Sequence, residues 1–176
     1  MIRIVMTIVM TIVMTIFMTI AGAWLAVGAA LAQSGDISED AFQRKLDQAA
    51  ELNITAPWRE SQEILDQLRP HLATASPEQY AEYAYLEARN VGLSGDPAAA
   101  LDKVAALLER NLTRRQKART YRLGANIAII SRRFEAAFRY LREGLELLEE
   151  ASGKLENDGL YGLASYAYAQ VGELDR

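Results

Sequence analysis

The sequence predicts an all-α protein in which antiparallel helix pairs stack behind an N-terminal signal or anchor helix. The first observation is that residues 4–35 carry no charged side chain and form a long apolar tract. The second is that the rest of the 176-residue chain has neither a sustained alternation of β-branched residues nor an Asn-Gly hairpin signal. The third is that helix-start signals recur at short intervals, so neighbouring helices are expected to pack antiparallel.

The N-terminal tract has the composition of an export signal. Met1-Ile2-Arg3 is a minimal basic start, and an apolar run with a repeated IVMT tetrad leads to Ala30-Leu31-Ala32, a pattern that signal peptidase cleaves. Cleavage between Ala32 and Gln33 would remove residues 1–32. Residues 4–31 are also long enough to stay as an uncleaved membrane anchor, since a bilayer span needs about 20 apolar residues. Both alternatives predict export, to the periplasm or to the periplasmic side of a bacterial inner membrane.

Residues 33–176 are expected to form a domain of seven helices. The expected ranges are 38–52, 57–73, 77–93, 97–110, 114–130, 134–150 and 158–170. Ser76 with Gln79 and Thr113 with Gln116 have the spacing of capping boxes, and Asp96 precedes a proline as an N-cap does. Asn53-Ile-Thr55 and Asn111-Leu-Thr113 match the glycosylation sequon, but both threonines are expected to be helix caps.

The helices are expected to form repeated pairs. The repeats are a degenerate one at 38–73, two at about 77–112 and 114–150, and a truncated one at 158–176. A small residue stands three positions after each of three recurring tyrosines, which gives the pairs Tyr85 and Ala88, Tyr121 and Gly124, and Tyr161 and Ala164. Ala100 and Ala137 stand in the second helices, where two helices must approach closely. Ser61 holds the small position of the first repeat.

This pattern resembles the tetratricopeptide repeat (TPR) family. The resemblance implies a right-handed superhelix, or α-solenoid, whose concave face binds a partner. The first helix of each pair lines that face in the family, which implies the binding residues Glu82, Tyr85, Arg89, Tyr121, Arg122, Tyr161, Ser165 and Tyr168. Tyrosine suits such a surface because it supplies a large contact area and one hydroxyl. Alternatively, these tyrosines only pack between repeats.

Charge is segregated along the chain. Residues 36–102 hold thirteen acidic and five basic side chains, whereas residues 110–142 hold ten basic side chains and one acidic one. The bases of the second stretch form a candidate basic patch: Arg114, Arg115, Lys117, Arg119, Arg132, Arg133, Arg139 and Arg142. One interpretation is that basic helices neutralise acidic neighbours. The other is a surface for an acidic partner, lipid headgroups or phosphate. Nucleic acid is not an expected partner, because an exported domain meets little of it.

Composition excludes several kinds of chemistry. The chain has no cysteine and a single histidine, His71, so disulfides, thiolate metal sites and two-histidine mechanisms are excluded. No glycine-rich phosphate loop is present either. We therefore expect no catalytic residue, metal ion or cofactor. The predicted function is a non-catalytic module that binds a protein, a peptide or a small ligand, and the alternatives are a structural scaffold or an enzyme with an unrecognised site.

A second resemblance concerns the combination of segments. The N-terminal signal, the segment LDQAAELNITAPWRESQEILDQL and irregular repeats ending in YAQVGELDR resemble the periplasmic input region of certain bacterial membrane-bound diguanylate cyclases. In such receptors a transmembrane helix and a catalytic GGDEF domain follow the repeats. The resemblance implies a sensory role in a larger membrane receptor, and it supplies no catalytic residue.

The last expected helix is too apolar for a solvent-facing end of the array. It carries Leu160, Tyr161, Leu163, Ala164, Tyr168 and Val171. A repeat array needs an end with a polar outer face. We therefore expect this surface to be substantially exposed, with a turn at Gly172-Glu173-Leu174 and a covering partner helix beyond Arg176.

Overall fold

The computed structural model describes residues 37–150 and 159–174, and these residues contain only helices and their connections. The helices are α2 (Glu39–Thr55), α3 (Trp58–Leu68), the short 3₁₀ helix η1 (Arg69–His71), α4 (Pro77–Leu93), α5 (Pro97–Leu108), α6 (Arg114–Ile130), α7 (Phe134–Glu150) and α8 (Leu160–Leu174). All of them belong to one compact unit that begins at Glu39. The predicted all-α fold is confirmed for this part of the chain.

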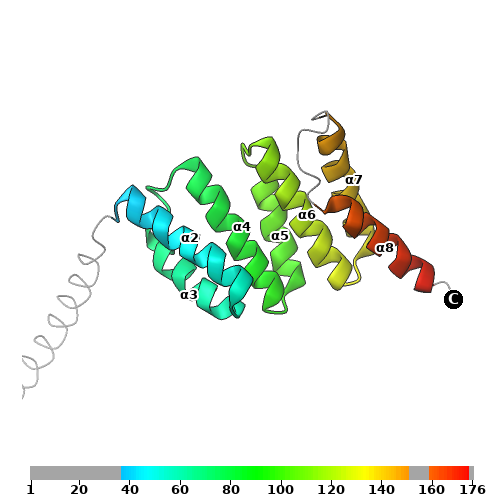
Figure 1. Ribbon diagram of the computed structural model, residues 1–176, viewed down its shortest axis with the longest axis horizontal. Coiled ribbons are helices and arrows are strands. Elements are labelled where there is room, and N and C mark those ends of the chain that lie inside the picture. Colours follow the sequence, from blue (N-terminus) through cyan, green and yellow to red (C-terminus); the bar gives the residue numbers. More distant parts are fainter. Residues whose placement is uncertain (1–36, 151–158, 175–176) are drawn as a thin grey trace, which may run out of the picture. The chain divides into compact units, whose positions relative to one another are not determined.

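Consecutive helices pack against one another in pairs (Figure 1). The pairs are α2 with α3, α4 with α5, and α6 with α7. Both helices of a pair also contact the first helix of the next pair. Helix α8 extends this order, because it packs against both α6 and α7. Short connections make the members of each pair run in opposite directions, as Figure 1 shows.

Local capping chemistry sets most of the helix starts. Ser76 and Thr113 each accept a hydrogen bond from the backbone three residues on, and Gln79 and Gln116 return one, so both capping boxes are formed. The Asp96 side chain caps α5 through the Ala99 backbone N–H, at 3.0 Å. Three helices, at 77–93, 114–130 and 134–150, have the predicted bounds.

Three local predictions were wrong. Helix α3 ends at Leu68 rather than at residue 73, because Pro70 lacks a backbone N–H and only a 3₁₀ turn follows. Thr55 is not an N-cap: its hydroxyl donates to the Glu51 carbonyl at 2.9 Å within α2, and Pro57 precedes α3. Helix α8 continues to Leu174, so the expected turn at 172–174 is helical.

All the predicted small positions except the half-buried Ala164 are buried between helices. Ala88, Ala100 and Ala137 are fully buried, and so is Ser61. A Cβ added at Gly124 would lie 3.0 Å from Val104 of α5 and 3.1 Å from Tyr140 of α7. Helix α6 therefore touches the preceding and the following second helix at the same position.

Among residues 37–150 and 159–174, no helix is long and apolar enough to cross a membrane. The predicted signal or anchor, residues 4–31, and the predicted cleavage site between Ala32 and Gln33 lie outside the described residues.

Candidate binding groove

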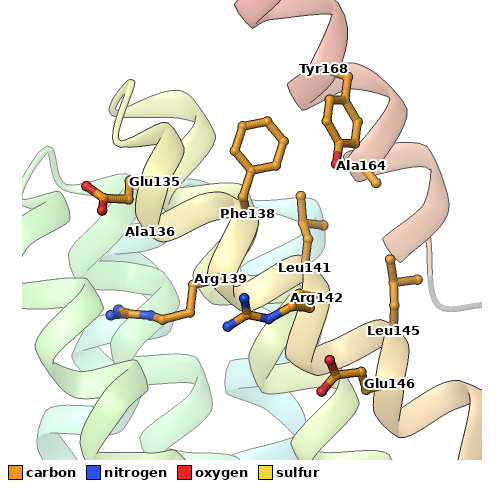
Figure 2. A pocket seen from close by; sticks show the side chains of 10 residues that line it. All are labelled: Glu135, Ala136, Phe138, Arg139, Leu141, Arg142, Leu145, Glu146, Ala164 and Tyr168. Atoms are coloured by element: carbon orange, nitrogen blue, oxygen red, sulfur yellow. The ribbon is translucent and has the colours of Figure 1, made fainter.

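A groove of about 970 Å³ lies along α7, with α8 beside it (Figure 2). Its lining is Glu135, Ala136, Phe138, Arg139, Leu141, Arg142, Leu145 and Glu146 from α7, and Ala164 and Tyr168 from α8. The first and last α7 residues of the lining are eleven positions apart, which corresponds to about 16 Å of helix. The groove therefore has the length of a three-turn helix.

Helix α7 presents two different surfaces. Ala137, Tyr140 and Leu148 are buried in the core of the domain. Phe138 and Leu145 are half-buried and line the groove, and Leu141 between them also borders the groove but is only 2% exposed and belongs to the core as well. Their spacing of three and four residues forms an apolar stripe along the helix. In Figure 2 these three side chains point toward the side of α8, whereas the arginines extend along the other side of α7.

Helix α8 is anchored at its first turn and exposed further along. Leu160 is fully buried. A Cβ added at Gly144 of α7 would lie only 3.0 Å from Leu160 and from Tyr121, so the absent side chain lets α8 approach. Tyr168 is 68% exposed, although its ring lies 4.8 Å from the Phe138 ring. The expected exposed apolar surface on this helix is therefore present at Tyr161 and Tyr168, whereas Leu160 is covered.

Four charged side chains follow the groove. Glu135 and Glu146 stand at its two ends, and Arg139 and Arg142 stand between them (Figure 2). All four are exposed. Within the described part of the chain, none of the four forms a salt bridge. The Arg139 guanidinium lies 5.4 Å from the ring centroid of its neighbour Tyr140. Both arginines therefore remain available to a ligand.

Two of the predicted concave-face residues belong to a cluster that joins α4 to α6. The Arg119 guanidinium donates to both carboxylate oxygens of Glu82, at 2.5 and 2.9 Å. It also lies 3.7 Å from the ring centroid of Tyr85, which is only 7% exposed. Burial lowers the pKa of Arg119, but the hydrogen bonds and charge of Glu82 outweigh it, so the net pKa is raised. Glu82, Tyr85 and Arg119 therefore hold two helices together.

The other predicted concave-face residues have different surroundings. Tyr121 is half-buried and its ring lies 6.4 Å from that of Tyr140 in α7; burial, and then Glu143, raises its pKa. Tyr161 is 48% exposed, and the exposed Ser165 hydroxyl donates back to the Tyr161 carbonyl. Arg89 and Arg122 are half-buried, and Arg122 has an interaction partner. Only Tyr168 lies in the groove, so a single concave site remains a prediction.

The candidate basic patch is spread over α6, α7 and the turn between them. Arg119 is paired with Glu82, and Arg114 also has an interaction partner. The exposed members are Arg114, Arg115, Arg132, Arg133, Arg139 and Arg142, and Lys117 is half-buried. Only Arg139 and Arg142 share a groove with apolar side chains.

Sequence reasoning missed the apolar lining of the groove. Phe138, Leu141 and Leu145 recur at helical spacing on α7, but a second apolar stripe on a helix is usually core, so it carried no distinct signal. In the described ranges, no group of acidic or histidine side chains is placed to hold a metal ion. No protein-family model matches the chain, and neither a curated protein nor a solved structure does.

Proposed function

We propose that residues 33–176 form a non-catalytic, TPR-like module that binds a protein or peptide partner in the groove along α7. The observation that carries the proposal is the combination of an apolar stripe and two unpaired arginines over about 16 Å of helix. Apolar surface supplies affinity, and charges beside it supply orientation and specificity. An elongated partner uses the whole length of the groove, whereas a compact small molecule uses only part of it.

The proposed architecture is a right-handed superhelix of TPR-like repeats. A constant register between successive first helices supports it, since Asn53 of α2 pairs with Asn90 of α4, and Glu82 of α4 pairs with Arg119 of α6. Both pairs are 37 residues apart. A repeated helix-pair step in which each unit contacts its neighbours is the defining property of such arrays.

The proposed location is the periplasm or the periplasmic side of the inner membrane. The apolar run at 4–31 and the cleavage pattern at Ala30-Leu31-Ala32 support it. We further propose that the module is the sensory part of a larger membrane receptor such as a diguanylate cyclase, on the resemblance of the segments around Trp58 and Tyr168. A fusion of alkaline phosphatase after Arg176 tests the location. Activity in intact bacteria is expected, and a silent fusion of normal abundance would contradict export.

Site-specific photo-crosslinking in living cells tests the binding site. A photoreactive amino acid replaces Phe138 in the groove, and a matched control replaces the exposed Glu60 of α3. A discrete protein adduct is expected only at position 138, and it is expected to weaken when Tyr168→Asp places a carboxylate beside the apolar stripe. Equal adducts at both positions, or an adduct indifferent to Tyr168→Asp, would contradict the groove as the binding site.

A further inference from the structure

The four charges along the groove form a symmetric pattern. Glu135, Arg139, Arg142 and Glu146 are spaced four, three and four residues apart, so they lie on one stripe of α7. Their signs are negative, positive, positive and negative, and the order is the same in both directions along the helix. We call these four residues the charge stripe. The apolar stripe of Phe138, Leu141 and Leu145 lies beside it.

This symmetry argues against a second copy of the chain as the occupant. When two charge stripes face each other antiparallel and centred, Glu135 lies opposite Glu146 of the other copy, and Arg139 lies opposite Arg142. A parallel arrangement in register also places like charges together. An arrangement offset by one or two turns brings opposite charges together at two of the four positions and leaves at least half of each charge stripe without an opposite charge. Opposed like charges disfavour an interface.

We propose that the groove binds an amphipathic helix of another protein that carries the reverse pattern. Its charge order is base, acid, acid, base, with spacings of four, three and four residues, next to an apolar stripe. The two acids pair with Arg139 and Arg142, and the two bases pair with Glu135 and Glu146. This inference rests on the proposed function and names its class of partner. Because the charge stripe is symmetric, the pattern does not depend on the direction in which the partner runs.

The apolar contacts fit the same occupant. Phe138 and Leu145 are half-buried, and the exposed ring of Tyr168 closes one side of the groove against Phe138. Ala164 of α8 faces the groove and corresponds in the repeat to Gly124 of α6. Gly124 is enclosed by helices on both sides, because it contacts α5 on one side and α7 on the other. A helix seated along α7 and α8 would enclose Ala164 in the same way.

Two labelled helical peptides of about 16 residues test the proposal, a length that spans the charge stripe. Both carry the same leucine stripe. One has lysine, glutamate, glutamate and lysine at the proposed spacing, and the other has these charges exchanged. Fluorescence anisotropy with the full chain is expected to show that the first binds at least about tenfold more tightly, with a preference that weakens at high salt.

A charge-reversal variant provides the matched control. Glu135→Lys, Arg139→Glu, Arg142→Glu and Glu146→Lys together keep the net charge and invert the stripe. The preference is expected to invert, so that the second peptide binds more tightly. Such a gain of binding cannot arise from misfolding. A preference that stays the same in the variant, or equal binding of both peptides, would overturn the proposed charge pattern.

Other outcomes separate this inference from the proposed function. If both peptides bind equally and Phe138→Asp abolishes binding, the groove is a peptide site and only the charge pattern is wrong. If neither peptide binds while circular dichroism shows a folded chain, the inference fails, whereas the proposed function is decided by the photo-crosslink at position 138. Analytical ultracentrifugation is expected to show no self-association that depends on Phe138 or Tyr168. A dimer lost on Tyr168→Asp would overturn the inference in favour of a second copy.

Discussion

Arg119 of α6 clamps Glu82 of α4 through two parallel hydrogen bonds, with its guanidinium stacked on the buried ring of Tyr85. Such a bidentate pair is stronger than a single-contact ion pair, and the aromatic face adds to it. The pair is about one-third exposed, so solvent weakens it. Arg119→Ala is therefore expected to lower the free energy of unfolding by about 1–3 kcal/mol, measured by urea denaturation.

Arg115 supplies the control for this prediction, because it lies one turn earlier on α6 and is exposed. Arg115→Ala is expected to change stability by less than about 0.5 kcal/mol. Arg119→Lys retains the charge but not the forked geometry, so it is expected to fall between wild type and Arg119→Ala. Equal losses for the alanine variants of Arg115 and Arg119 would show that the clamp contributes nothing specific.

A buried polar cluster gives a second prediction. Asn53 donates its side-chain N–H to the Asn90 side-chain oxygen, and Asn90 donates to Ser61 and Gln62 at 3.3 and 3.2 Å. Asn53→Ala or Asn90→Ala alone is expected to cost about 1–3 kcal/mol, because the remaining amide stays buried without this partner. The double variant is expected to cost less than the sum, by about 1–2 kcal/mol, in a double-mutant cycle from urea unfolding.

An exposed pair in α2 serves as the control cycle. Gln43 donates to Asp47 at 2.8 Å, one turn apart on the surface. The coupling between Gln43→Ala and Asp47→Ala is expected to be below about 0.5 kcal/mol. If the buried cycle is as nearly additive as this one, then the amides of Asn53 and Asn90 do not depend on each other, and the prediction is wrong.

Helix starts could be predicted from the sequence because capping is local. A serine or threonine followed three residues later by glutamine specifies its own hydrogen bonds, as at Ser76 and Thr113. The end of α3 was predicted wrongly, because the apolar pattern of the helix and the proline within it pointed to different end positions. Pro70 ended α3 early, although the apolar pattern continued beyond it.

Pairings between helices could not be predicted in the same way. The charge pattern placed Arg115 and Arg119 together in the candidate basic patch, but the structure engages Arg119 with Glu82 of α4. Asn53 stood out only as part of a sequon, yet it is buried against Asn90. Which side chains meet across two helices depends on register and rotation, and a single helix specifies neither. The groove along α7 was missed for this reason.

A third prediction concerns alkaline pH. Burial raises the pKa of the Tyr83 phenol above its ordinary value near 10, and the opposing hydrogen bond from Arg69 does not cancel this effect. The unfolded chain therefore loses this proton first, so the contribution to stability is complete below about pH 10 and is lost as pH rises toward the higher native pKa. Urea unfolding between about pH 9 and pH 11 is expected to show a steeper fall for wild type than for Tyr83→Phe.

Tyr166→Phe is the control for the pH series. Its ring is 53% exposed, so Tyr166→Phe removes the same hydroxyl group as Tyr83→Phe without changing a buried site. Other groups that titrate in this range are present in all three proteins and cancel in the comparison. Parallel curves for wild type and Tyr83→Phe would exclude Tyr83 as a source of alkaline instability.

The last prediction compares two helix ends that share one backbone geometry. After α4, Gly95 has φ +98° and its N–H bonds the Gly92 carbonyl, while the Asp96 N–H bonds the Val91 carbonyl. After α6, Arg132 has φ +58° and its N–H donates to the Ile129 carbonyl, while the N–H of the next residue, Arg133, donates to the Ala128 carbonyl. Both ends are Schellman motifs, whose left-handed position favours glycine.

Arg132 therefore carries a backbone cost that Gly95 avoids, since a side chain disfavours the left-handed region by about 1–2 kcal/mol. Arg132→Gly is expected to raise the free energy of unfolding by about 0.5–1 kcal/mol, after the larger chain entropy of glycine is subtracted. Gly95→Ala is expected to lower it by about 1 kcal/mol, and the added Cβ meets no atom within 4 Å, so this change reports backbone conformation alone. Urea unfolding of both variants measures the two changes in the free energy of unfolding, which should have opposite signs. A loss of stability in Arg132→Gly would mean that the Arg132 side chain contributes more than its backbone strain costs.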